Sequence, residues 1–533
     1  MKVTNQIRPT LGSPSPAAPF PEGRGTLDKY TPQKRSWEDD IIYFAMTDRF
    51  CNGDKSNDEG TDKSNPQRLH GGDWQGIIDK LDDLKKLGAT ALWISPVQEN
   101  DRDFLGMDGY HGYWPKDFYK TEPAFGNMAK LKELVEKSHE KGMKVVIDLV
   151  LNHTGYNHAW AHDPAKKEWF HDPKLSFQKD MEKGSLFGLP DLAQEKPEVG
   201  DYLIEMAKYW ARESKCDGFR LDAIMHFPAE FQQRFSEAMK KERGEDFFLL
   251  GEAYTGGAQR INEFKEKGKM DSVYDFPFSE AVRNVAGRNE DMSWFLPKWL
   301  RFRELMKEDF IGEAYRIKNG KSSAHQLHDL FAQDHVYDNP RMLTTLVENH
   351  DMPRFLEAAG PRAKDKFKQA LALEFGARGI PLLYYGAEDS LGLQKGECRA
   401  DKRDGEDPDM RAFVETLTSL RQNSVALRRG EQKELYVDKN TYAFARVHPE
   451  QTMIVAANFD KKARQHSIPM PGNDLRLLDH LTGKTYESQG DRLDVEIGPS
   501  GTLMLEVVGK VENPTPRAVK SWLDWIPFLH PRN

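Results

Sequence analysis

Eight short apolar runs, each typical of a buried β-strand, alternate with amphipathic stretches over most of the chain. Near-continuous apolar strands that alternate with helices indicate a parallel sheet with both faces buried. Eight such units predict an α/β fold, a (β/α)₈ TIM barrel, with a doubly wound open sheet as the alternative. The runs begin at Asp39, Ala89, Met143, Asp217, Phe247, Met270, Met342 and Gly379.

The amphipathic stretches between these runs have helix signals at their ends. Two of them, 76–88 and 127–142, end in a glycine, as expected at a helix C-cap. The connection after the third run, 152–198, has no clear apolar period and is rich in His, Asp and Trp. A connection this long inside a compact domain is usually functional, and we expect a small inserted domain there.

The pattern changes after Gly430, which predicts further units beyond the barrel. Short alternating strands separated by turn residues follow, and they predict an antiparallel β domain over 431–509. The barrel would then occupy 35–430. Residues 1–34 are rich in Pro, Gly and Ser and are expected to form a disordered tail, and the Pro-broken, aromatic stretch 510–533 a second tail.

Composition excludes several classes of partner. The chain has 533 residues and a net charge of −9, which argues against nucleic acid or an anionic membrane as a partner. No apolar run reaches the roughly 18 residues that a membrane span needs. The three cysteines lack CxxC spacing, so neither a disulfide framework nor a zinc site is indicated. No signal-peptide core is recognisable, which by sequence indicates a cytoplasmic protein.

Ionisable residues gather where the expected strands end. Asp148, Asn152 and His153 follow the third run, and Arg220, Asp222 and His226 follow the fourth; Glu252 follows the fifth, and His350 and Asp351 follow the seventh. In a barrel these ends share one face, which carries the active site. Converging carboxylates oppose each other's ionisation, so one would be ionised and another protonated. Glycosidic bond cleavage requires such a pair.

These residues lie in four segments that resemble the ordered signatures of the α-amylase family of glycoside hydrolases. The segments are "DLVLNH" (148–153), "GFRLDAIMH" (218–226), "GEAY" (251–254) and "VENHD" (347–351), and the resemblance extends over about 37–509. It implies Asp222 as nucleophile, Glu252 as general acid/base and Asp351 as the group that binds sugar hydroxyls and stabilises the transition state. Arg220 would keep Asp222 ionised. Further substrate contacts are expected from Tyr113, His153, His350, Phe187, Tyr254, Asp407 and Arg411.

Calcium is the expected cofactor. Hard oxygen ligands cluster in "RFCNGDKSNDEG" (49–60) and "HGGDWQG" (70–76), which resemble the N-terminal calcium site of cyclodextrin glucanotransferases. The ligands would be Asn52, Asp54, Asn57, Asp58, the Gly71 carbonyl and Asp73. The family's second site would use Asn152, Asp191 and the carbonyl of His226, and would pin the inserted segment over the cleft.

Three functions remain open from the sequence. The first is an endo-acting hydrolase of the α-1,4 bonds of starch and maltooligosaccharides. The second is a glucanotransferase or a cyclomaltodextrinase-like enzyme, favoured by Phe187, four residues before Asp191. A non-catalytic carbohydrate-binding protein is disfavoured because all three carboxylates are present.

Met225 stands where many relatives have a lysine that contacts sugar. We expect a monomer, and many relatives with two calcium sites are secreted.

Overall fold

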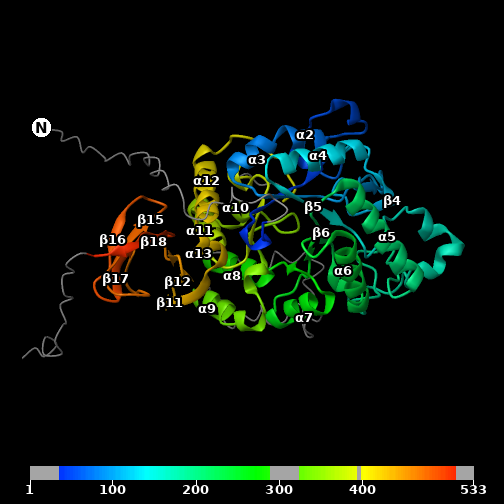
Figure 1. Cartoon of the computed structure of the whole chain (residues 1–533). Coiled ribbons are helices and arrows are strands. Elements are labelled where there is room, and N and C mark those ends of the chain that lie inside the picture. The colour runs from blue at the N-terminus through cyan, green and yellow to red at the C-terminus, as the bar shows by residue number, and fades with distance from the viewer. Residues whose placement is uncertain (1–34, 288–322, 393–397, 512–533) are drawn as a thin grey trace, which may run out of the picture.

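The computed structural model describes residues 35–287, 323–392 and 398–511. The expected tails, 1–34 and 510–533, therefore lie outside the described residues, apart from 510–511. In Figure 1 the strands β15 to β18 lie at the left-hand end of the molecule and helices α5 and α6 lie at the other end. No helix among the described segments is long and apolar enough to cross a membrane.

All eight expected strands form, and they pair in parallel in the order β8-β7-β6-β5-β2-β1-β10-β9. A parallel bridge between Tyr274 and Thr344 joins the two ends of this sheet, so the barrel closes. The barrel prediction is confirmed, and the open sheet is excluded. The strands are β1 (Ile42–Ala45), β2 (Ala91–Ile94), β5 (Lys144–Leu149), β6 (Gly218–Leu221), β7 (Phe248–Gly251), β8 (Ser272–Val273), β9 (Thr344–Leu346) and β10 (Ile380–Tyr384).

Helices surround the barrel because each has an apolar stripe to bury against the strands. Asn127 caps α4 by accepting a hydrogen bond from the Lys130 amide, and Gly88 ends α3 with φ +95°, as its glycine predicted. The stretch 76–88 is two helices rather than one, because the chain bends at Lys80. The main helices are α2 (Trp74–Asp79), α3 (Leu81–Leu87), α4 (Met128–Glu140), α5 (Pro197–Ser214), α6 (Ala229–Arg243), α7 (Ala258–Gly268), α8 (Phe276–Gly287), α11 (Ala363–Gly376) and α12 (Pro408–Asn423).

Short elements complete the loops of the barrel. They are α1 (Thr47–Phe50), α9 (His325–Phe331), α10 (Phe355–Ala358), α13 (Val425–Arg429) and an antiparallel pair, β3 (Gln98–Asn100) with β4 (Pro115–Thr121). The inserted segment 152–198 has little regular structure, only the 3₁₀ turns Ala159–His162 and Pro164–Trp169 before α5 begins. The long irregular connection expected after the third barrel strand is therefore present.

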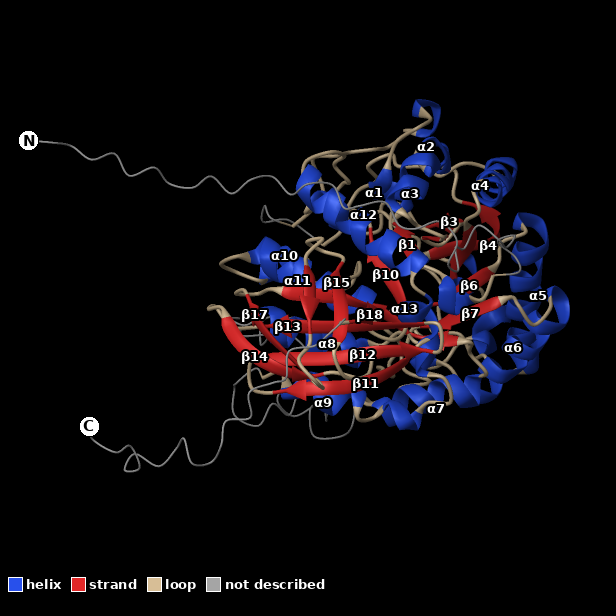
Figure 2. Ribbon diagram, turned by 60° about the vertical axis from the view of Figure 1, so that its left-hand side comes forward, coloured by secondary structure: helices blue, strands red, loops and turns tan. Residues whose placement is uncertain are grey.

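The C-terminal strands are antiparallel, as predicted. Six form one sheet in the order β11-β12-β13-β18-β15-β16, and β14 pairs with β17. Figure 2 shows this sheet in front of the barrel. The strands are β11 (Glu431–Val437), β12 (Thr441–His448), β13 (Gln451–Asn458), β14 (Arg464–Pro469), β15 (Leu475–Asp479), β16 (Thr485–Glu487), β17 (Arg492–Ile497) and β18 (Thr502–Lys510).

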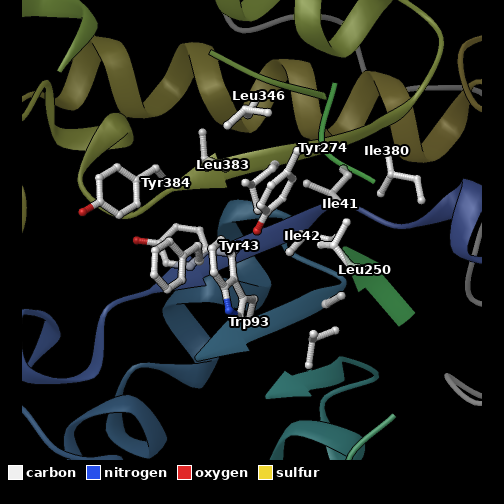
Figure 3. Close-up of a cluster of buried hydrophobic side chains, with 14 of the residues drawn as sticks. Ile41, Ile42, Tyr43, Trp93, Leu250, Tyr274, Leu346, Ile380, Leu383 and Tyr384 are labelled. Atoms are coloured by element: carbon white, nitrogen blue, oxygen red, sulfur yellow. The ribbon is translucent and has the colours of Figure 1, made fainter. Parts of the chain in front are cut away.

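Side chains of the strands fill the centre of the barrel. Trp93 and Tyr274 are fully buried there, in a cluster with branched aliphatic side chains (Figure 3). The rings of Trp93 and Tyr274 lie 6.0 Å apart at an angle of 44°. This packed interior leaves the strand ends as the place where polar side chains can meet.

Candidate active site

Arg220 is the centre of a cluster of carboxylates at the ends of β5, β6 and β7. Its side chain is completely buried, and Nη1 donates to Asp148 Oδ1 (3.0 Å) and to Asp222 Oδ1 (2.8 Å). Its Nη2 lies 2.7 Å from Glu252 Oε1 in a charge contact that lacks hydrogen-bond alignment. One guanidinium thus contacts three acids that come from three different strands.

Aromatic rings enclose this guanidinium. Its Cζ lies 5.3 Å from the ring centre of Trp93, 5.7 Å from that of Tyr113 and 5.8 Å from that of Tyr274. Such faces attract a cation and exclude water at the same time. The charge of Arg220 therefore acts on the carboxylates through a medium that screens it weakly.

Glu252 is held in its protonated form near neutral pH. Burial, together with the charges of Asp222 and Asp351, raises its pKa to about 8, although Arg220 acts in the opposite direction. Its Oε2 accepts a hydrogen bond from the Ala223 amide at 3.1 Å. This environment agrees with the expectation that one of the converging acids is protonated.

Asp351, unlike Glu252, is deprotonated near neutral pH. Burial acts to raise its pKa, but His350 and Arg399 outweigh it and lower the pKa to about 2. His350 Nε2 lies 3.1 Å from Asp351 Oδ2, and Arg399 Nη2 donates to Asp351 Oδ1 at 2.9 Å. At neutral pH the site therefore holds a carboxylate at Asp351 and a carboxylic acid at Glu252.

Tyr113 and two histidines form one wall of the site. Tyr113 donates a 2.7 Å hydrogen bond to Asp148 Oδ2, and its ring stacks on that of His350 with centroids 5.3 Å apart. His153 Nε2 lies 3.0 Å from the Tyr113 carbonyl. Burial lowers the pKa of His350 to about 3, so this imidazole is neutral. The Nδ1 atoms of His153 and His350 are buried without a hydrogen-bond partner in the described structure.

Two residues of the cluster were not predicted as part of the site. Arg399, which contacts Asp351, lies in the loop after β10, and a loop arginine carries no periodic signal. His111 is buried beside Tyr113, with ring centroids 5.6 Å apart, and burial keeps its pKa well below the ordinary value. His111 lies two residues before Tyr113, which was expected to contact the substrate.

Two of the expected substrate contacts, Asp407 and Arg411, make contacts within the fold. Asp407 caps α12 by accepting from the Met410 amide, and it also accepts from Ser390 Oγ at 2.5 Å. Arg411 pairs with Asp83 of α3 at 2.7 Å. These contacts tie α12 to its neighbours, and none of them connects Asp407 or Arg411 to the carboxylate cluster. Both side chains therefore help to hold the fold, and their expected contact with substrate stays a prediction.

Phe187 and Tyr254 are the two remaining aromatic candidates. The Phe187 side chain is 59% exposed, and its ring lies 6.0 Å from Phe177, which in turn lies 5.8 Å from the ring of His226. Tyr254 packs against Phe276 with centroids 4.4 Å apart. Met225 is buried, as a thioether would be.

The residues expected at the first calcium site lie close together. Asn52 lies beside Asp58, with Nδ2 and Oδ1 2.6 Å apart, and a side chain at Gly71 would collide with both. The Oδ1 atoms of Asn52 and Asn57 are buried and have no partner in the described structure, which fits a cation. Asp73 accepts from the amides of Gly53, Asp54 and Gly76. The Asp54 carboxylate is exposed and accepts from Ser56.

The second expected site lies where the inserted segment meets β5. Asn152 Nδ2 donates to Asp191 Oδ1 at 2.9 Å, and the buried Asn152 Oδ1 has no partner in the described chain. His171 Nδ1 lies 2.6 Å from Asp191 Oδ2. His226 Nδ1 lies 3.0 Å from the Met181 carbonyl. No group of three or more His, Cys, Asp or Glu side chains within the described segments is arranged to hold a metal. Any cation would therefore need amide and carbonyl oxygens in addition to one or two carboxylates.

The barrel, the inserted segment and the paired acids define a carbohydrate-active enzyme. Residues 44–432 match the family model for the α-amylase catalytic domain. The chain belongs to the α-amylase family of glycoside hydrolases.

Relatives within this family differ in their stated activities. The chain is 31% identical to a beta/alpha-amylase of Paenibacillus polymyxa over 89% of its own length, but it spans only 38% of that protein. It is 28% identical to a cyclomaltodextrin glucanotransferase of Geobacillus stearothermophilus, covering 90% of this chain and 67% of the relative. It is 29% identical to a cyclomaltodextrinase of Thermoanaerobacter pseudethanolicus, covering 80% and 71%.

A solved structure shares the whole architecture. An Anoxybacillus α-amylase superimposes with a TM-score of 0.79 at 35% identity, covering 90% of this chain and 100% of that one. The α-amylase of Geobacillus thermoleovorans, solved with acarbose, gives 0.77 at 32% identity, with the same coverage.

Proposed function

We propose that the chain is a retaining, endo-acting hydrolase of α-1,4-glucosidic bonds in starch-like polysaccharides and maltooligosaccharides. The protonation states of the acids around Arg220 carry this proposal. Glu252 carries a proton near neutral pH, whereas Asp351 is ionised and Asp222 contacts a fixed positive charge. A retaining glycosidase needs one acid that can give up a proton and one carboxylate that can attack carbon.

In the first step the Asp222 carboxylate attacks the anomeric carbon of the bound sugar. Glu252 gives its proton to the glycosidic oxygen as the bond from carbon to that oxygen breaks. The leaving chain departs with a free hydroxyl, and the remaining sugar is an ester of Asp222. Asp351 and the imidazoles of His153 and His350 would bind the sugar hydroxyls, where contacts that strengthen with developing positive charge lower the barrier.

In the second step Glu252, now ionised, accepts a proton from water. The water oxygen bonds to the anomeric carbon, and the bond to Asp222 breaks. Two displacements restore the original configuration. Tyr113, which is fixed by its hydrogen bond to Asp148, offers a ring against the sugar at the cleaved bond.

Transfer to a sugar is the second candidate reaction at the same site. If a sugar hydroxyl replaces water in the second step, the same atoms move and the product is a longer chain. The 59% exposed ring of Phe187 favours this reaction, because an apolar ring over the ester would exclude water and stack on an acceptor sugar. We therefore propose mainly hydrolysis, with measurable transglycosylation at high oligosaccharide concentration.

Calcium is proposed as a structural cofactor at two positions. Asn52, Asn57, Asp58, Asp73 and the Gly71 carbonyl would hold one ion, and Asn152, Asp191 and the His226 carbonyl a second. Support comes from the buried amide oxygens without partners at both positions. A bound Ca²⁺ would supply charge that neutralises these oxygens and stabilises the folded loops.

The test is the stereochemistry and the spectrum of products. NMR of freshly cleaved maltoheptaose should show the α-anomer first, and soluble starch should yield maltooligosaccharides. Asp222→Asn and Glu252→Gln should each lower kcat by at least about 10²–10⁴-fold. Asp460→Asn, on the C-terminal domain, is the matched control. A β-anomeric product, or starch cleavage at the normal rate by either site variant, would overturn the proposal. Pullulan and cyclodextrins as substrates separate it from a cyclomaltodextrinase-like activity.

A further inference from the structure

Phe187 has a backbone conformation that a bulky residue rarely adopts. Its φ is +55°, in the left-handed region, and Gly188 follows with φ +80°. A residue such as phenylalanine remains in that region only when surrounding contacts hold it there. The aromatic ring that this backbone presents is one of the few large apolar side chains exposed in the described structure.

Tyr156 contacts the backbone of Phe187 directly. Its Oη donates a 3.0 Å hydrogen bond to the Phe187 carbonyl. The carbonyl belongs to the peptide unit that joins Phe187 to Gly188, so this bond fixes the plane of the peptide between the two left-handed residues.

Tyr156 is itself held by rings that belong to the barrel loops. It stacks on Phe104 with centroids 4.1 Å apart and an angle of 3°, and Trp114 meets it edge-on at 5.3 Å. The next residue, Asn157, donates its amide to Asp101 Oδ2 at 2.7 Å. Tyr156 therefore has a fixed position relative to the barrel.

The loop that carries Phe104 is also anchored. Phe104 pairs with Met107 in a small antiparallel bridge, and Asp108 Oδ1 accepts from the Asp103 amide at 3.0 Å. Asp108 also binds Arg68 at 3.1 Å. The path from the barrel through Phe104 and Tyr156 to Phe187 is thus continuous.

We propose that Tyr156 is a positioning residue that holds the Phe187 ring in place and thereby sets the partition between hydrolysis and transfer. The inference rests on the proposed function, because it assigns Tyr156 to the reaction that Phe187 would influence. Tyr156 touches no reacting atom. It acts through the peptide after Phe187, and the exposed ring then shields the glycosyl ester from water.

Tyr156→Phe is the informative variant, because it removes only the hydroxyl and keeps the stack on Phe104. The ratio of transfer to hydrolysis products from maltotetraose should fall about twofold to tenfold, the range for one neutral hydrogen bond. The total rate of cleavage should stay within a factor of about two. Tyr202→Phe is the matched control, since its ring also packs on the inserted segment, against Trp160 and Trp169.

A double-mutant cycle separates positioning from general loosening. Tyr156→Phe should change neither the product ratio nor KM once Phe187 is replaced by alanine, because its target is gone. An equal effect in both backgrounds would overturn the inference. If the wild type forms no product longer than its substrate, the transfer proposal fails, and the same cycle on KM for hydrolysis still tests the positioning.

A crystal structure of Tyr156→Phe gives a readout that needs no activity. Residue 187 should leave the left-handed region, or its ring should lose a defined position. Phe187 found at φ near +55° with its ring unmoved would overturn the inference, whatever the enzyme is shown to cleave.

Discussion

Arg220 Nη1 lies 2.8 Å from Asp222 Oδ1; Arg220 lies in β6, and Asp222, two residues later, directly follows the last residue of that strand. Residues i and i+2 of a strand point to the same side, so β6 alone places the cation beside the proposed nucleophile. The other end of the guanidinium reaches Glu252. The forked guanidinium contacts the two acids through different nitrogens.

Arg220→Lys should therefore inactivate the enzyme although the charge is kept. A lysine has a single nitrogen, which cannot occupy the positions of both Nη1 beside Asp222 and Nη2 beside Glu252, so kcat should fall at least about 10²-fold. Arg234→Lys, at an exposed pair with Asp201, is the control and should have no effect. Initial rates on maltoheptaose are the measurement, and an Arg220→Lys variant that works at half the normal rate would refute the shared role.

The decrease of kcat/KM at alkaline pH should follow the deprotonation of Glu252. Its pKa is raised to about 8, so the proton needed for the first step is lost as pH rises through 8. We expect kcat/KM to fall on that side with an apparent pKa near 8. In Asp222→Asn the negative charge that raises this pKa is gone, and carboxyl-labelled NMR should show Glu252 titrating at lower pH. An unchanged titration would contradict the coupling.

The free energy of unfolding should depend on the protonation of Glu252. The folded-state pKa is above the ordinary value for glutamate, so the folded state binds the proton more tightly than the unfolded chain. This contribution is complete below about pH 4.5 and is lost as pH rises towards 8. Glu252→Gln cannot ionise, and at pH 8 it should be more stable than the wild type by about 1 kcal/mol or more. Urea unfolding at pH 5 and pH 8 gives the comparison, with the gain expected at pH 8 only.

Removal of calcium should lower the melting temperature. An ion that binds only the folded state stabilises it by roughly 2.7 kcal/mol at 100 times its dissociation constant. Asp58→Ala should weaken the response to chelator more than Asp54→Ala, because Asp58 lies against Asn52 and Gly71 whereas Asp54 is exposed. Calorimetry with and without chelator tests this. An unchanged melting curve in a metal-free preparation would count against both sites.

Phe187→Gly should lower the ratio of transfer to hydrolysis without abolishing cleavage. Glycine tolerates the positive φ at this position, so the variant removes the ring without adding backbone strain. Chromatography of the products from concentrated maltotetraose is the measurement. Equal amounts of longer products from the glycine variant and the wild type would show that the ring has no part in acceptor choice.

The barrel could be predicted because its strands are buried on both faces, which leaves uninterrupted apolar runs. The acids at the ends of β6 and β7 could be placed for the same reason, since a strand end is visible in sequence. The break at Lys80 could not be predicted, because it involves neither glycine nor proline. Arg399 was missed because it reaches Asp351 from an irregular loop.

The role of Asp407 and Arg411 could not be decided from the sequence for a different reason. "DPDMR" combines an N-cap aspartate with proline at the first helical turn, which is also the usual start of a helix. A short polar motif with two physical explanations cannot be assigned without its neighbours. In the structure Asp407 contacts Ser390 and Arg411 contacts Asp83, and both contacts hold helix α12 against its neighbours.

The closure of the barrel between β8 and β9 divides the proposed catalytic residues into two groups. Asp222 and Glu252 follow strands on one side of this seam, whereas Asp351 follows β9 on the other. The seam has a single bridged residue pair, supported by the hydroxyl contact of Ser272 with Thr344 at 2.8 Å. Amide exchange should therefore be fastest along this line. A sugar that contacts both groups of catalytic residues would connect the two sides of the seam. Its binding should therefore slow amide exchange most at the seam.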